Sequence, residues 1–234
     1  EPVIQRGVKP VITLQQITLK DVRNYPKVRA YIDAANQQMA AIGYTEHGHR
    51  HAGEYSSVTR TICESLGYTP RQAELAAIAA YLHDIGNMVN RLNHPEIGAI
   101  IAMNILDEMG MDPREIATVV AAIGNHEEGN GMPIDYASAA VIIADKSDVH
   151  YSRVQNSRPE TYDIHDRVNH AVQRSNLYVE PDKHIIRLDL EIDTTFASVM
   201  EYFEIFIERM VMCRKAAEQL GCRFCLRVNG VDLG

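Results

Sequence analysis

Several features that would assign a chain to a class at once are missing from this sequence. No apolar run approaches the roughly 20 residues needed to span a bilayer, and residues 1–6 show no signal-peptide pattern. Internal repeats and low-complexity segments are also missing. The sequence therefore predicts a cytoplasmic protein with no membrane partner, built as one large domain or as a domain with an appendage.

An excess of positive charge is missing too. The chain has 23 Lys and Arg residues against 31 Asp and Glu residues, which gives a formal net charge of −8. Nonspecific binding to duplex nucleic acid usually needs a basic face, so we expect no duplex nucleic acid partner. A small phosphorylated substrate is compatible with this balance, because metal ions can supply local positive charge.

Cysteine is scarce, with four residues in 234, so the sequence provides no disulfide framework. Cys222 and Cys225 have the spacing of a metal or redox pair, but only one such pair exists. The pair lies in a predicted strand, where residues three apart point to opposite faces. We interpret these thiols as structural, with zinc or redox chemistry as the alternative.

Periodic apolar positions predict a mainly helical fold. Val28, Ile32, Ala35 and Met39, for example, recur on one face of a helix. The predicted helices cover residues 21–42, 52–66, 70–85, 95–109, 113–123, 136–150 and 164–176.

Three of these helices share a start signal, which is a proline at the first helical position, where its missing N–H costs nothing. The three residues are Pro70, Pro95 and Pro113. Two of the starts also resemble capping boxes, in which Thr69 would pair with Gln72 and Asp112 with Glu115.

The last part of the sequence changes character. Alternation from Ile186 onward predicts a strand over 184–192, and a second strand is predicted over 222–228. Thr194 or Thr195 can cap a long helix between them. The expected fold is therefore a helical bundle with a small C-terminal α+β appendage, which could form a homo-oligomer contact. We expect a lead-in and helix over 1–45, the core over 46–178 and the appendage over 179–234.

The most informative stretch is an apolar, helix-patterned run from Ala79 to Asn87 that contains His83 and Asp84. An ionised carboxylate on a buried helix is costly unless something pairs with it. A divalent metal is a partner that also suits the histidine. The alternative is a core histidine that is hydrogen-bonded beside an aspartate that reaches solvent. Gly86 is interpreted as a helix stop.

Other predicted elements carry metal-type side chains at their ends. For the histidines among them, a surface or capping role is the alternative. Asp145 continues an apolar stripe of its helix, where an unpaired carboxylate would be out of place. Three nearby glutamates, Glu46, Glu127 and Glu128, are interpreted as solvated or as supporting the ligands. The candidate metal ligands are His51, His83, Asp84, His94, His126 and Asp145.

This order of residues resembles the HD-domain superfamily of metal-dependent phosphohydrolases, named for its His-Asp pair, over about residues 47–150. In that family a histidine on the first helix, the pair and a later aspartate bind one metal, and two further histidines bind a second. The matching positions are His51, His83, Asp84 and Asp145 for the first metal and His94 and His126 for the second. The resemblance implies two divalent metal ions, of Mn, Fe, Zn, Ni, Co or Mg.

Two strings are similar to the HD-GYP branch of that family, which hydrolyses cyclic di-GMP. They are His83-Asp84-Ile85-Gly86 and His94-Pro95-Glu96-Ile97-Gly98-Ala99. The chain departs from the branch at Asn87, where Lys is usual, and at Asn125, where a second His is usual. Residues 129–133 replace the longer Gly-Tyr-Pro segment. With these features missing, the likeness implies neither cyclic di-GMP specificity nor a third metal.

The implied activity is hydrolysis of a phosphomonoester or phosphodiester bond of a nucleotide, by a hydroxide that bridges two metals. Asp84 is the natural bridge between the metals, because a carboxylate has two oxygens. Lys146 could donate to a phosphate in catalysis, although its side chain points about 100° away from Asp145 around the helix.

Other residues are candidates for the substrate or for an additional metal contact. Arg153 and Arg158 could bind a second phosphate or a base, because guanidinium matches phosphate in bidentate fashion, or they could be solvated loop residues. His47 could be an extra ligand, since it lies four residues before His51.

Two other functions stay open at this stage. A metal- or nucleotide-binding sensor or scaffold would retain the same core without catalysis. An oxygenase would use a di-iron pair, as some relatives of the family do, and nothing in the sequence favours it.

Overall fold

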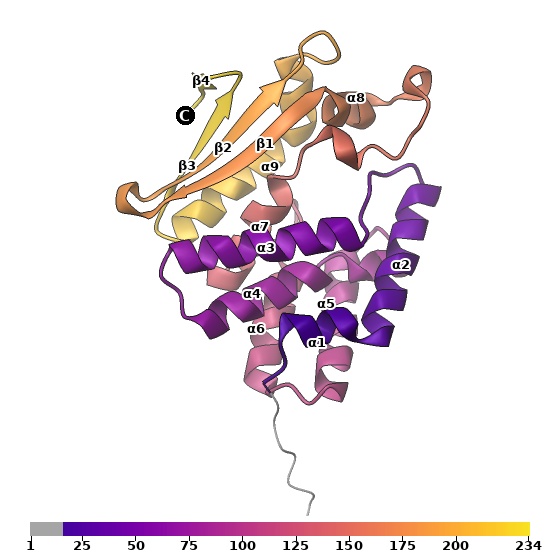
Figure 1. Ribbon diagram of the computed structural model, residues 1–234, viewed down its shortest axis with the longest axis vertical. Helices are drawn as coiled ribbons and strands as arrows, with labels where there is room; N and C mark the ends of the chain where they lie inside the picture. The colour runs from indigo at the N-terminus through magenta and orange to yellow at the C-terminus, as the bar shows by residue number, and fades with distance from the viewer. Residues whose placement is uncertain (1–15) are drawn as a thin grey trace, which may run out of the picture.

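The computed structural model describes residues 16–234, which form a helical body with a small sheet at one end (Figure 1). Nine α-helices in this range confirm the predicted fold class. The body consists of α1 (Leu19–Asn24), α2 (Pro26–Ala41), α3 (His49–Ser65), α4 (Pro70–Leu82), α5 (His94–Glu108), α6 (Pro113–Gly124), α7 (Tyr136–Lys146) and α8 (Ile164–Ala171). A 3₁₀ turn, η1 (Ile85–Met88), joins α4 toward α5, and three further 3₁₀ turns are η2 (Tyr151–Arg153), η3 (Pro159–Thr161) and η4 (Pro181–Lys183).

Two helices at the centre of the body are buried on every side. All residues of α4 from Leu75 to Leu82 are buried, and so are all residues of α7 from Ala137 to Lys146. Alanine is frequent in both helices, and its small side chain lets neighbouring backbones approach closely. The helices α3, α6 and α7 all pack against α4. The residues at the C-terminal ends of α4 and α7 are therefore held by the core itself.

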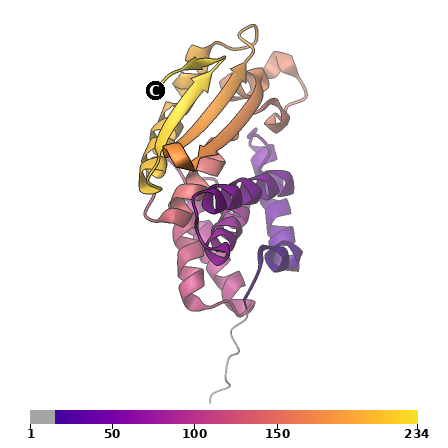
Figure 2. The ribbon, with the colours of Figure 1, turned by 60° about the vertical axis from the view of Figure 1, so that its left-hand side comes forward.

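The sheet is built from β1 (Val172–Glu180), β2 (Ile185–Ile192), β3 (Arg223–Val228) and β4 (Val231–Asp232), in that spatial order. β1 and β2 pair antiparallel, whereas β2 and β3 pair parallel and are joined through α9 (Val199–Gln219). Leu188 lies beside Leu226 and Leu190 beside Val228, and these buried residues form the apolar face. The helix α9 lies against the sheet and also packs against α7 (Figure 2).

Near the N-terminus, several observed elements differ from the predicted ones. The lead-in lies largely outside the described residues. The helix predicted over 21–42 is wrong as a single element, because Tyr25 is extended and Pro26 starts a second helix. The capping box at Thr69 is confirmed, whereas Asp112 accepts from the backbone N–H of Arg114, and Glu115 bonds to Arg71 instead.

Further differences lie near the C-terminus. The helix predicted over 136–150 ends at Lys146. The helix predicted over 164–176 ends at Ala171, and the chain continues directly as β1, a strand that the sequence analysis missed. Neither Thr194 nor Thr195 caps α9, because Ser198 does so, in a capping box with Glu201. The predicted strands over 184–192 and 222–228 are confirmed as β2 and β3.

Within residues 16–234, no helix combines the length and the apolar character that crossing a membrane requires. The four cysteines are free and buried, in agreement with structural thiols.

Candidate metal centre

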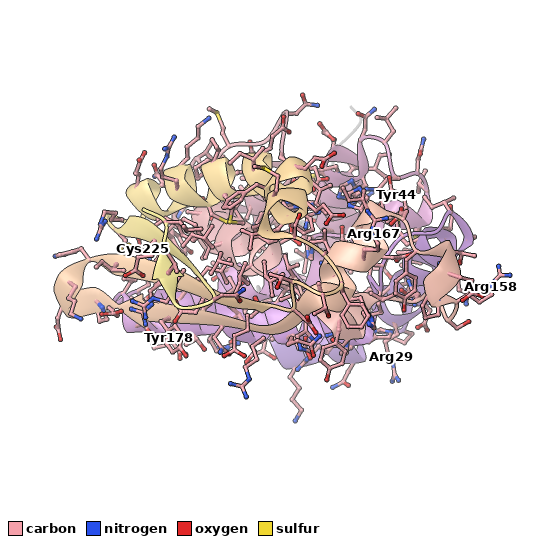
Figure 3. The ribbon with its side chains drawn as sticks, turned by 90° about the horizontal axis from the view of Figure 1, so that it is seen from above. Arg29, Tyr44, Arg158, Arg167, Tyr178 and Cys225 are labelled. Carbon is pink, nitrogen blue, oxygen red and sulfur yellow. The ribbon has the colours of Figure 1, made fainter. Side chains whose placement is uncertain are left out.

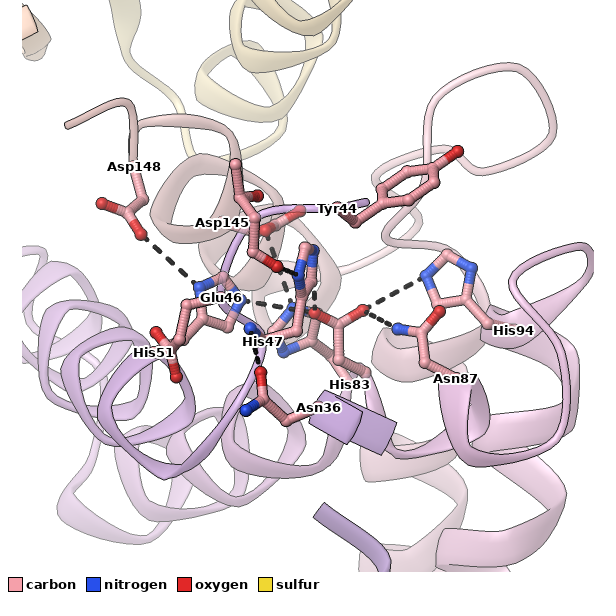
Figure 4. A network of polar contacts seen from close by, with 12 residues as sticks. Asn36, Tyr44, Glu46, His47, His51, His83, Asn87, His94, Asp145 and Asp148 are labelled. Atoms are coloured by element: carbon pink, nitrogen blue, oxygen red, sulfur yellow. Dashed lines mark hydrogen bonds and ion pairs between the residues drawn. The ribbon is translucent and has the colours of Figure 1, made fainter. Parts of the chain in front are cut away.

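Six side chains from five parts of the helical body converge on one cluster (Figure 4). α3 supplies one histidine, and the end of α4 supplies the His-Asp pair. The start of α5, the loop directly after α6 and the end of α7 each supply one further residue. All six are at most 9% exposed. They are His51, His83, Asp84, His94, His126 and Asp145, so the structure brings together every predicted metal ligand.

The carboxylate of Asp84 lies in the middle of the cluster. Its Oδ2 atom is 3.2 Å from Nε2 of His83 and 3.3 Å from Nε2 of His51. Its Oδ1 atom is 3.3 Å from Nε2 of His94 and 4.0 Å from Nε2 of His126. The two oxygens therefore face two different groups of histidines.

Asp145 and the remaining contacts complete the two groups. Oδ1 of Asp145 is 3.6 Å from Nε2 of His83, and the Nε2 atoms of His94 and His126 are 3.1 Å apart. Donor atoms that lie within 4.8 Å of one another form three sets that could hold a metal ion. The sets are His51, His83 and Asp145; His83, Asp84 and His126; and His94, His126 and Glu127.

Backbone carbonyls fix the orientation of three of these histidines. Nδ1 of His83 is 2.7 Å from the carbonyl oxygen of Ala80, and Nδ1 of His126 is 2.6 Å from that of Ile123. Nδ1 of His94 likewise faces the carbonyl of Arg91 at 3.0 Å. A carbonyl can only accept, so Nδ1 of each ring donates to it, and Nε2 points into the cluster. Metal-binding histidines are typically held in this way.

The cluster contains buried nitrogen atoms that make no well-formed hydrogen bond within residues 16–234 and could therefore bind a divalent metal. Nε2 of His51 and Nε2 of His83 are buried and lie 3.3 Å and 3.2 Å from Oδ2 of Asp84, but neither makes a hydrogen bond of good geometry among the described residues. Buried polar atoms normally have a partner. Imidazole nitrogens with carboxylate oxygens form a donor set that suits divalent transition metals. These residues therefore could hold one or two cations.

The charges of the cluster favour a cation as well. Burial would raise the pKa values of Asp84 and Asp145, but His83 beside Asp84 and Lys146 beside Asp145 outweigh it and hold both pKa values well below the usual range. Burial lowers the pKa of His83, yet the two carboxylates outweigh burial and raise it to about 10. Burial and the positive charge at His83 hold the pKa of His126 well below its usual range. Two ionised carboxylates therefore stabilise a positive charge between them.

A close backbone approach places His94 next to Asp84. A Cβ atom on Gly86 would lie 2.0 Å from the carbonyl oxygen of His94 and 2.6 Å from the backbone nitrogen of Gly98. Only glycine fits, so η1 can lie directly against the start of α5. The interpretation of Gly86 as a helix stop is corrected here, because α4 already ends at Leu82.

The sequence analysis missed Asp148, which lies just after α7. Oδ2 of Asp148 is 3.5 Å from Nδ1 of His51 and 3.3 Å from Nε of Arg153. Burial would raise the pKa of Asp148, but Arg153 and His51 outweigh it and lower this pKa. Its position three residues after Asp145 was the only signal in the sequence. Arg153 is itself buried, so the alternative of a solvated loop residue is wrong for it.

Lys146 is also buried, and three carboxylates surround its ammonium group. Nζ lies 2.7 Å from Oδ2 of Asp145, 2.8 Å from Oε2 of Glu127 and 2.5 Å from Oε2 of Glu128. The side chain thus turns back toward Asp145 rather than away from it. In this arrangement, Lys146 positions Asp145 and the two glutamates.

Three other residues with basic side chains lie around the cluster or farther from it. Arg91, which the sequence analysis did not consider, lies with Nη1 3.1 Å from Nε2 of His94 and Nη2 2.6 Å from Glu127. His47 lies before α3 rather than on it, and its Nε2 is 3.9 Å from Oδ2 of Asp84. Arg158 is exposed and points outward at the edge of the molecule, in agreement with the alternative of a solvated loop residue (Figure 3).

A comparison with protein families agrees with this geometry. The sequence over residues 49–150 matches the model of the HD domain family. Residues 49–150 are an HD domain. No curated protein is significantly similar to the chain. All six residues of the cluster lie inside the HD domain, as does Asp148, whereas α8, the sheet and α9 follow it.

Proposed function

We propose that this chain is a metal-dependent phosphohydrolase that cleaves a phosphomonoester or phosphodiester bond of a nucleotide. The observation that carries the proposal is the position of Asp84 in the HD domain, with one oxygen toward His51 and His83 and the other toward His94 and His126. A carboxylate in this position is suited to bridge two cations.

The ligand roles in the proposal follow from the two groups. His51, His83 and Asp145 would hold one cation with Oδ2 of Asp84. His94 and His126 would hold the other with Oδ1 of Asp84. Two divalent cations there would lower the pKa of a water for attack at phosphorus and neutralise charge on the phosphoryl oxygens.

The surrounding residues would bind and orient the substrate. Arg91 lies at the edge of the cluster and could bind phosphoryl oxygens in bidentate fashion. Lys146 would keep Asp145 ionised and correctly oriented rather than contact the phosphate. The likeness to the HD-GYP branch rests on the two strings at His83 and His94, and the proposal does not depend on it.

A second candidate is a non-catalytic metal- or nucleotide-binding sensor. One observation favours it, because the guanidinium of Arg91 already places a positive charge beside His94, with Nη1 also 4.0 Å from Oδ1 of Asp84. A positive charge there competes with a second cation, and a site with one cation could bind a nucleotide without cleaving it.

The test combines elemental analysis with a hydrolysis screen over phosphomonoesters, linear dinucleotides and cyclic dinucleotides. We expect about two transition metals per chain and turnover that falls more than about 100-fold in His83→Ala and Asp84→Asn, because both lose metal ligands. Asp182→Asn, a change at an exposed residue of η4, is the matched control. Full turnover in Asp84→Asn would refute the proposal, and metal binding without turnover on any of these esters would support the sensor.

A further inference from the structure

A cavity of about 360 Å³ lies beside the cluster, between the HD domain and the C-terminal elements. This volume falls at the small end of the range for small-molecule sites. The connection between α2 and α3 forms one wall and rises toward α8 (Figure 1). The helices α8 and α9 form the others, with Asp166 and Asn169 on α8 and Phe206 and Arg209 on α9. Most of this lining therefore comes from outside residues 49–150.

Two residues of the cavity wall contact the metal cluster, one on each side of Asp84. His47 lines the cavity and contacts the Oδ2 side of Asp84 at 3.9 Å. Arg91 also lines it and contacts the Oδ1 side at 4.0 Å. A phosphate bound at the cluster would therefore project its organic group into this cavity.

Two residues of the α8 wall carry hydrogen-bond acceptors that protein donors leave largely free. Asn169 is 4% exposed, and its Nδ2 donates to the carbonyl of His165, while its Oδ1 is buried with no partner among the described residues. Asp166 is also buried, and its Oδ2 accepts one hydrogen bond, from Asn156 at 3.2 Å. In the described part of the chain, no cation lies within ion-pair distance of Asp166.

The position of Asp166 near the start of α8 has a structural explanation, but the unpaired Oδ1 of Asn169 does not. An acidic residue in the first turn is favoured by the helix dipole, which accounts for Asp166. Asn169 lies one turn further along α8, where that effect has faded. A buried acceptor without a donor costs free energy in the unbound protein. The unpaired Oδ1 of Asn169 therefore points to a ligand that donates a hydrogen bond.

Aromatic rings paired with guanidinium groups also line the cavity. The guanidinium of Arg209 lies 4.7 Å from the ring centre of Phe206, and that of Arg91 lies 5.5 Å from the ring centre of Tyr44. All four residues line the cavity. The basic groups, the flat apolar surfaces and the acceptors at α8 together match a phosphate ester of a ring-containing group that carries donors.

We propose that Asp166 and Asn169 select the substrate by accepting hydrogen bonds from two neighbouring donors on the group esterified to the phosphate. The two residues are three apart on one helix, so they present their acceptors on the same face. Either the N1–H and 2-amino group of guanine or the vicinal hydroxyls of a sugar would supply such a pair. The inference rests on the proposed function for the position of the phosphate.

The experiment measures binding by calorimetry, without relying on turnover. Guanosine and inosine differ by the 2-amino group, and ribose 5-phosphate and 2-deoxyribose 5-phosphate differ by one hydroxyl of the diol. Inorganic phosphate is the third probe. The proteins are the full chain, Asp166→Asn and Asn169→Ala, with Asp182→Asn and Asn176→Ala as controls at exposed positions.

We expect the full chain to bind the donor-bearing member of one pair about tenfold or more tightly, because losing a donor leaves a buried acceptor unpaired. Asp166→Asn, which keeps the size of the side chain, and Asn169→Ala should both reduce this ratio. The control variants should retain it, and the affinity for inorganic phosphate should stay unchanged in all of them. Discrimination of guanosine would identify the base as the donor, and discrimination of ribose 5-phosphate would identify the sugar.

Equal binding within both pairs would overturn the proposal, and so would an equal loss of inorganic phosphate binding in the α8 variants, which would indicate a purely structural role. The two proposals fail separately. Discrimination without hydrolysis would leave the α8 wall intact and refute the phosphohydrolase. Hydrolysis without discrimination would support the phosphohydrolase and refute the role of the α8 wall.

Discussion

The amide of Asn87 and three backbone carbonyls orient several polar groups of this cluster. Nδ2 of Asn87 donates to Oδ1 of Asp84 at 2.8 Å, which fixes the plane of the carboxylate without adding charge. A lysine at position 87 would add a positive charge beside Asp84 and compete with a cation. Asp148 extends the same arrangement to His51, the cluster histidine on α3, with a carboxylate in place of a carbonyl.

Replacing Asp148 tests this support at the scale of one residue. Asp148→Asn should weaken metal binding about 10- to 100-fold, because His51 loses the carboxylate that orients its ring and makes it more basic. Calorimetric titration of the metal-depleted protein with Mn²⁺ measures the effect, with Asp107→Asn at an exposed position of α5 as the control. Unchanged affinity in Asp148→Asn would show that the contact at 3.5 Å does not support the ligand.

At the scale of elements, the join between α4, η1 and α5 depends on one position without a side chain. Gly86 lets η1 lie against the first turn of α5, and that contact carries His94 to Asp84. Gly124, the last residue of α6, is less constrained, because a Cβ there would meet only Ala99 Cβ at 3.8 Å.

These two glycines form a matched pair of substitutions. Gly86→Ala should lower the free energy of unfolding by about 1–3 kcal/mol or more, since backbone atoms of α5 must move away. It should also weaken metal binding, because His94 moves with them. Gly124→Ala should raise stability by up to about 1 kcal/mol, because alanine favours the helix. Thermal and chemical unfolding measure both, and equal stability of the two variants would contradict the close approach.

Sequence patterns predicted the elements whose signals are local. The apolar stripes and helix-start prolines gave most helices, and the metal-type residues at their ends gave the whole cluster. β1 was missed because Arg174, Ser175 and Asn176 interrupt any alternation on this outer strand. Arg91 and Asp148 were missed for another reason: each has a partner that is distant in sequence, Glu127 for Arg91 and His51 for Asp148.

At the scale of the whole molecule, the helical body and the sheet share one core. A single cluster of buried residues extends from Ile17 to Val228. The helix α9 packs against α7, which supplies Asp145, and Arg209 of α9 pairs with Glu128 at 2.7 Å. The predicted boundary at residue 178 falls inside β1.

The shared core predicts that the segment 46–178 does not fold by itself. Without α9, the buried apolar face of α7 would be exposed to water, which costs free energy in proportion to its area. We expect the full chain to unfold in one cooperative transition, and the segment to show no sharp transition by circular dichroism. A segment that unfolds cooperatively and binds Mn²⁺ like the full chain would contradict this.

The glycine-rich loop over residues 125–133, directly after α6, bears on how the folded protein responds to proteases. Exposed loops rich in small residues are usually the first sites that a protease cuts. Here Glu127 pairs with Arg91 and Lys146, and Glu128 pairs with Lys146 and Arg209, so ion pairs from three other parts of the chain hold neighbouring residues of the loop. Gly131 adds a tight backbone contact with Asn125. A protease must extract a segment of several residues to cleave it, so this loop should remain intact in the folded protein despite its composition.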